Sequence, residues 1–174
     1  MTSDKRTLIA LNVVGGIAVL GSYAWGALGQ PAAMDALWGG VPESARGIYT
    51  VNMFLSAFGY MLFTPYIVFR WLDGARTSLV AAAYAAILIP SALWLPLTAW
   101  LVASPGAAVW WLVRLDLALV ALGSAGLLVM LLRSGADRRM KGHAFAVLGL
   151  LPFCLQTVVL DAIVWPLYYP KTWS

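Results

Sequence analysis

The chain has 174 residues, of which 62% are hydrophobic and 10% are charged, and its mean hydropathy is +0.85. A soluble domain carries about 25% charged residues, so this composition excludes a soluble protein and indicates an integral membrane protein. The net charge of +4 does not indicate a nucleic-acid partner, because membrane proteins concentrate Lys and Arg on their cytoplasmic flank. A single cysteine (Cys154, expected as a small buried hydrophobe) and a single histidine exclude an internal disulfide and a zinc site built from Cys and His.

Five apolar segments are long enough to cross the roughly 30 Å hydrocarbon layer of a bilayer, which takes about 20 helical residues. We expect these spans near residues 7–28, 48–71, 77–103, 108–132 and 143–168. Short connections favour antiparallel neighbours. The sequence therefore predicts an all-α membrane protein in which residues 1–174 form a single five-helix transmembrane bundle.

Basic residues gather at one end of the predicted spans. Eight of them share that side: Lys5, Arg6, Arg70, Arg76, Arg133, Arg138, Arg139 and Lys141. The opposite side has only Arg46 and Lys171. The positive-inside rule then predicts a cytoplasmic N-terminus and an extracytoplasmic C-terminus, in a bacterial inner membrane. The first apolar run begins like a signal peptide, but it continues past 20 residues without a small-x-small cleavage site before Gln30, so we expect it to remain as a span.

The one long connection, residues 29–47, is expected outside the membrane. It contains Pro31, Pro42 and the pair Gly39-Gly40, which argue against a continuous helix. Long loops in compact domains often have a function, commonly as a lid. Trp38 in this loop has two interpretations: it covers a bound ligand, or it anchors the loop at the headgroup layer.

Polar and ionisable side chains inside the spans are the sharpest chemical signal, because such groups are costly in lipid and usually face the bundle interior. Asp116 and Asp161 both lie about 11–12 Å from the outer ends of their spans, at 1.5 Å per helical residue. Arg114 either extends to the interface or pairs with a carboxylate on another helix. The predicted ligand-binding residues, most of them in the outer half beneath the loop, are Trp38, Asn52, Tyr60, Tyr84, Ser91, Trp94, Arg114, Asp116, Gln156 and Asp161.

These residues allow a cavity for an amphipathic ligand, or an interhelical hydrogen-bond network that only holds the helices together. Two carboxylates could also serve as general acid and base, although we find no nucleophile elbow, phosphate loop or metal motif. Six of the nine tryptophans fall near span ends, where interfacial aromatic belts are expected: Trp25, Trp71, Trp110, Trp111, Trp165 and Trp173. Only Trp94 and Trp100 lie deeper.

The third span runs Tyr84-Ala-Ala-x-Leu-x-x-Ser91-x-Leu-Trp94-x-Pro96. This pattern resembles the third helix of the TspO/MBR family, the translocator or tryptophan-rich sensory proteins, which reads Tyr-x-x-Gln-Leu-x-x-Asn-x-x-Trp. The fifth span, with Leu151-Pro152-Phe153 and Leu160-Asp161-x-x-Val164-Trp165, is similar to the family's fifth helix. Ser91 and Asp161 replace asparagines, Gln156 replaces a tryptophan, and the Trp-x-Pro-Pro stretch of the family's first loop is absent.

The resemblance implies a TspO-like five-helix bundle, often dimeric, so that a homodimer is expected. It also implies a non-enzymatic receptor or transporter that binds a porphyrin, haem or a sterol-like lipid in an outward-facing pocket and requires no cofactor. Trp94 and Trp38 would stack on the ligand, while Ser91, Gln156 and Asp161 would supply hydrogen bonds. The alternatives are a small intramembrane enzyme that acts on an isoprenoid or lipid through Asp116 and Asp161, and an accessory subunit of a larger membrane complex.

Overall fold

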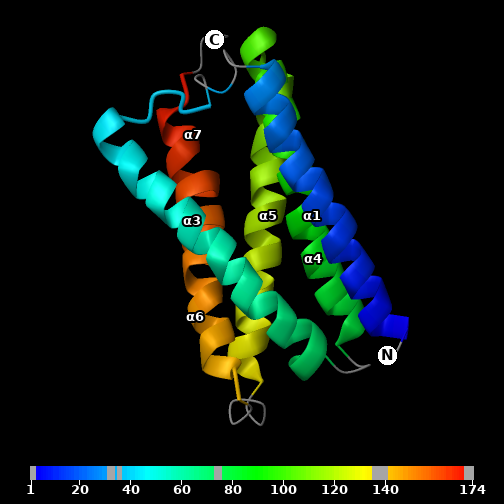
Figure 1. Cartoon of the computed structure of the whole chain (residues 1–174). Helices are drawn as coiled ribbons and strands as arrows, with labels where there is room; N and C mark the ends of the chain where they lie inside the picture. Colours follow the sequence, from blue (N-terminus) through cyan, green and yellow to red (C-terminus); the bar gives the residue numbers. More distant parts are fainter. Residues whose placement is uncertain (1–2, 31–33, 35–36, 73–75, 135–140, 171–174) are drawn as a thin grey trace.

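A computed structural model of the chain describes residues 3–30, 34, 37–72, 76–134 and 141–170 (Figure 1). The helices are α1 (Ser3–Gly29), α3 (Glu43–Tyr66), α4 (Thr77–Ala103), α5 (Ala107–Arg133), α6 (His143–Cys154) and α7 (Trp165–Tyr168), with two π-helices, η1 (Ile67–Trp71) and η3 (Leu155–Val164). No strand occurs among these residues. Five helical segments are long and apolar enough to cross a membrane, which confirms the all-α five-helix bundle and the integral membrane protein.

The span boundaries agree with the sequence prediction at the third and fifth spans and differ at the second. That helix begins at Glu43 instead of residue 48, because Pro42 fixes φ at −56° and its carbonyl already accepts hydrogen bonds from the amides of Ala45 and Arg46. The connection after the first span is correspondingly shorter. Predicted features at Pro31, Arg138, Arg139, Lys171 and Trp173 lie outside the described residues.

The helices form a ring in which α1 packs on α4, α4 on α5, α5 on the last span, and the last span on α3. The ring closes at one end, where η1 contacts α1. We call this the N-terminal end; it holds the starts of α1, α4 and α6 and the ends of η1 and α5 (Figure 1). The opposite, C-terminal end holds the end of α1, the start of α3, the α4–α5 turn and α7 (Figure 1). Towards this C-terminal end α1 and α3 diverge (Figure 1).

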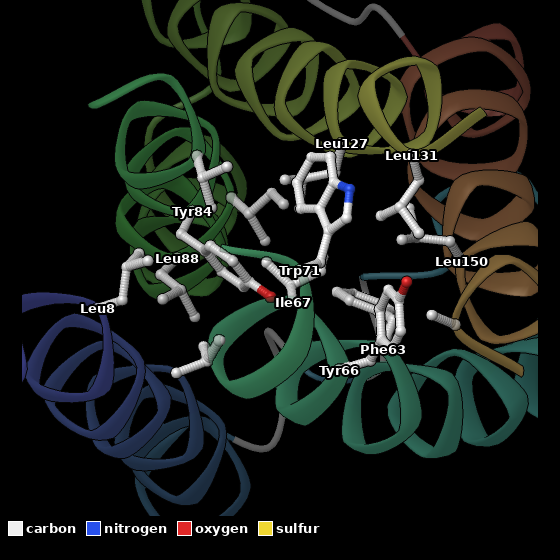
Figure 2. Packing of buried hydrophobic residues seen from close by; sticks show 14 of the residues in the cluster. Leu8, Phe63, Tyr66, Ile67, Trp71, Tyr84, Leu88, Leu127, Leu131 and Leu150 are labelled. Carbon is white, nitrogen blue, oxygen red and sulfur yellow. The ribbon is translucent and has the colours of Figure 1, made fainter. Parts of the chain in front are cut away.

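Two hydrophobic clusters fill the two halves of the bundle. The cluster of the N-terminal half includes Leu8, Phe63, Trp71, Leu127 and Leu150, and Figure 2 shows these side chains meeting between the helices. The cluster of the C-terminal half is richer in large aromatic rings and contains Val41, Tyr49, Val113, Trp110 and Trp165.

Both π-helices follow a proline within the same span. Pro65 lies two residues before η1, and Pro152 lies three residues before η3. A proline inside a helix removes one main-chain hydrogen bond and clashes with the carbonyl four residues earlier, and a change of helix type accommodates that disturbance. By contrast, α4 stays an α-helix through Pro90 and Pro96. Short π segments are frequent at functional sites, which directs attention to η3.

Candidate ligand-binding site

Trp94 and Asp116 stand at the same depth on adjacent antiparallel helices. Trp94 lies nine residues before the end of α4 at Ala103, and Asp116 lies nine residues after the start of α5 at Ala107. Each is therefore about 13 Å from the turn, at 1.5 Å per residue. Trp94 Nε1 and Asp116 Oδ2 are both buried without a hydrogen-bond partner among the described residues. Buried polar atoms usually have a partner, so these two atoms mark a place where the protein leaves hydrogen bonds unmade.

Aromatic rings from several helices surround this level of the bundle. The Trp94 ring centroid lies 6.2 Å from that of Tyr23 in α1 and 6.5 Å from that of Trp165 in α7. Trp165 in turn packs against Trp110 at 6.0 Å and Tyr169 at 4.8 Å. Burial also raises the pKa of Tyr169, so its hydroxyl stays neutral. A ligand that enters at this level of the bundle must displace some of these rings.

The first-loop residues close the C-terminal end above these rings. Trp165 Nε1 donates a hydrogen bond to the Leu37 carbonyl at 2.6 Å, and the Gly40 amide donates to the Tyr168 carbonyl at 3.0 Å. Gly39 has φ of +53°, in the left-handed region that favours glycine. Trp38 packs edge-on against Tyr49 at 6.1 Å, with the Arg46 guanidinium carbon 5.5 Å from its ring centroid. The turn at 37–40 agrees with the prediction of a broken loop.

Three other predicted residues satisfy one another in a chain of hydrogen bonds. Asn52 Nδ2 donates to Gln156 Oε1 at 3.0 Å, and Gln156 Nε2 donates to Asp161 Oδ1 at 2.8 Å. Asn52 and Ser56 also donate to the Pro152 carbonyl, at 3.1 and 2.8 Å. The network joins α3 to the last span, so these predicted ligand-binding residues hold the two helices together. The Tyr49 hydroxyl donates to the Leu160 carbonyl at 3.1 Å, so the neighbouring Asp161 lies close to one of the aromatic rings of this half.

The predicted ion pair of Arg114 with a carboxylate is not what the structure shows. Arg114 Nη1 donates to the Ala162 carbonyl of η3 at 2.6 Å. Within the described part of the chain, Asp116 Oδ2 has no partner and Asp161 Oδ1 accepts from Gln156. The Arg114 bond fixes the register of α5 against η3, and it brings Asp116 level with Asp161.

Tyr60 and Tyr84 lie away from this level, in the N-terminal half. Tyr84 donates to Thr64 Oγ1 at 3.1 Å, Tyr60 bonds Asn12, and the two tyrosine rings pack edge-on at 6.2 Å. The structure therefore does not bring them together with Trp94. Ser91 is partly buried, three residues before Trp94, and no hydrogen bond to another described residue is recorded for its hydroxyl.

The sequence did not single out Tyr23 or Tyr49, and it assigned three buried tryptophans to an interfacial belt. Trp71, Trp110 and Trp165 are only 3–5% exposed, so for them the belt prediction is wrong. Trp25 and Trp111 are exposed at 45% and 67%, as a belt requires. Position near a span end does not decide which face of the helix a residue occupies. No group of three or more His, Cys, Asp or Glu within the described ranges could hold a metal ion.

No protein-family model, no curated protein and no solved structure matches this chain.

Proposed function

We propose that this protein binds a hydrophobic ligand with a polar group in the C-terminal half of its bundle, as a receptor or transporter. The observation that carries the proposal is the pair of buried, unpartnered atoms at one depth, Trp94 Nε1 and Asp116 Oδ2. Leaving a buried donor or acceptor unsatisfied costs about 1–3 kcal/mol each. A ligand that supplies the missing partners recovers that free energy on binding, and the surrounding rings offer a large apolar contact.

The chemistry of the two atoms narrows the ligand class. Trp94 Nε1 can only donate, and an ionised Asp116 can only accept. A hydroxyl group does both, which favours a sterol-like lipid. The resemblance to the TspO/MBR family adds porphyrin and haem, whose flat ring systems would stack on Trp94. With the charge distribution of the sequence, the C-terminal end would face the outside of a bacterial inner membrane, and the family likeness implies a homodimer.

Access to the site is expected from the side, between α1 and α3. These helices diverge towards the C-terminal end (Figure 1), and the first loop is tied down by Trp165 and Tyr168. The rings of Tyr23 in α1 and Trp94 in α4 pack against each other, and both side chains are only partly buried. Rotation of these two rings would admit a ligand from the lipid without opening the loop.

The test is a titration of the purified protein with protoporphyrin IX, haem and a sterol in separate experiments, followed by tryptophan fluorescence. We expect saturable quenching for at least one ligand, and a roughly tenfold weaker affinity in Trp94→Ala, which equals about 1.4 kcal/mol. The control is Trp111→Phe, whose ring is exposed and should leave the affinity unchanged. No saturable quenching with any ligand, or equal affinities in the two variants, would contradict the proposal.

One observation favours an enzyme as the second candidate, namely that Asp116 and Asp161 stand level on neighbouring helices. Two carboxylates in different surroundings can divide the roles of acid and base. Mass spectrometry of the ligand recovered after incubation separates the candidates. An unchanged ligand supports binding alone, whereas conversion that is lost in folded Asp116→Asn and Asp161→Asn variants supports the enzyme.

A further inference from the structure

A cavity open to the surface lies at the N-terminal end of the bundle, far from the site described above. It has a volume of about 280 Å³ and is lined by Trp71 of η1, Arg76 before α4, Leu79 of α4, and Val129 and Arg133 of α5. Two of its lining residues are arginines. The cavity lies between the end of η1, the start of α4 and the last turn of α5, and the ends of membrane-spanning helices are expected near the lipid headgroups.

The walls of this cavity divide into a basic part and an apolar part. The Arg76 guanidinium carbon lies 4.9 Å from the Trp71 ring centroid, which holds one positive charge at the cavity by a cation–π contact. Arg133 is exposed at the end of α5. Leu79 and Val129 are 61% and 45% exposed, so their side chains face outward and meet lipid tails where the bundle lies in a bilayer.

Trp71 adds a hydrogen-bond donor to this region. Its side chain is only 3% exposed, and its Nε1 is buried without a partner among the described residues. Figure 2 shows the indole ring lying against Leu127 and Leu131 of α5, so apolar contacts hold it in place.

We propose that this cavity binds the phosphate group of an anionic phospholipid, with an acyl chain lying along Leu79 and Val129. Arginine binds phosphate through paired N–H groups, and basic pockets between transmembrane helices recognise anionic headgroups. The apolar walls favour a lipid over free phosphate, because a lipid has an acyl chain that can contact them and inorganic phosphate has no apolar part. Because the basic residues of the sequence predict this end to be cytoplasmic, the lipid belongs to the inner leaflet.

The test measures lipid retention by native mass spectrometry of the full-length protein released from a neutral detergent. The probes are phosphatidylglycerol and the zwitterionic phosphatidylcholine. We expect preferential retention of phosphatidylglycerol, reduced about fivefold in Arg76→Gln and in Arg133→Gln, the size expected for one basic residue at a membrane surface. Arg70→Gln is the matched control, because Arg70 is exposed on η1 at the same end and is not one of the lining residues.

The variants separate a defined site from general attraction to negative charge. A preference for phosphatidylglycerol that survives in Arg70→Gln but falls in both cavity variants supports the proposal. An equal fall in all three variants would overturn it, because any basic residue would then suffice. A large excess of inorganic phosphate that abolishes the preference would also overturn it, in favour of a soluble phosphate ligand.

Discussion

Gln156 and Asp161 are five residues apart in one helix, and Gln156 Nε2 donates to Asp161 Oδ1 at 2.8 Å. In a regular α-helix, residues three and four apart are neighbours, and a spacing of five turns the second side chain away. The ten-residue π-helix η3, with its i to i+5 repeat, brings the two side chains together. Gln156 thereby connects Asn52 of α3 to a carboxylate at the level of the candidate ligand site.

The first prediction concerns Gln156→Ala. The change leaves Asn52 without one acceptor and Asp161 without its amide donor. We therefore expect the unfolding free energy to fall by about 1–2 kcal/mol. A polar contact between membrane helices contributes about 0.6 kcal/mol on average and up to about 1.7 kcal/mol. Chemical denaturation in detergent measures it. Thr50→Ala is the control, since the exposed Thr50 hydroxyl only bonds the Arg46 carbonyl of its own helix. A loss no larger than in the control would contradict the bridging role.

The second prediction contrasts the two carboxylates through Asp116→Leu and Asp161→Leu. Leucine has the same branching as aspartate, with two methyl groups in place of the carboxylate oxygens, so both changes remove polarity without leaving a cavity. Asp116 has a buried oxygen without a partner, and we expect its replacement to raise the unfolding free energy by about 1–3 kcal/mol, the cost of an unsatisfied group. Asp161 accepts from Gln156, so its replacement should lower stability.

Ligand affinity supplies the second measurement on these variants. If Asp116 is kept for binding, the more stable Asp116→Leu protein should bind its ligand more weakly, a trade-off typical of functional sites. A destabilised Asp116→Leu protein would mean that the carboxylate has a structural partner after all.

The third prediction concerns the close approach of α3 and α6 at Gly59 and Gly149. A Cβ atom on Gly149 would lie 2.8 Å from the Gly59 carbonyl oxygen, and main chain cannot move aside as a flexible side chain does. We expect Gly149→Ala to lower the unfolding free energy by about 1–3 kcal/mol, the usual cost of overpacking. Gly16→Ala in α1 is the matched control, because nothing lies within 4 Å of its added Cβ. It should be neutral or slightly stabilising, and a similar loss in both variants would refute the packing argument.

The sequence predicted the spans well because the bilayer sets the hydropathy and the length that a spanning helix needs, whatever the packing of its side chains. It also placed Trp94, Asp116 and Asp161 at one depth, because residue counting from a short turn is reliable in straight antiparallel helices. The start of α3 at Glu43 was missed, since the segment after Pro42 is too polar to count as membrane-spanning although it is helical.

The partners of the side chains were harder to predict than their depths. Hydropathy does not say which face a residue occupies, so Trp110 and Trp165 were assigned to the interface although they pack on each other in the core. Tyr23 was overlooked because a tyrosine near a span end is ordinary. A spacing of five would keep Gln156 and Asp161 apart in an α-helix, and only the structure shows that a π-helix brings them together.

The last prediction concerns the closure of the C-terminal end and uses Trp165→Phe. This change removes the Nε1 hydrogen bond to the Leu37 carbonyl but keeps an aromatic ring beside Trp110. The turn at 37–40 would then be held mainly by the hydrogen bond from the Gly40 amide to the Tyr168 carbonyl. We expect the Gly40 amide to exchange its hydrogen about fivefold faster, which corresponds to the loss of about 1 kcal/mol for one hydrogen bond. Hydrogen–deuterium exchange read by mass spectrometry measures this, with Trp111→Phe as the exposed control. Unchanged exchange at Gly40 would contradict this prediction and show that the first loop is held independently of Trp165.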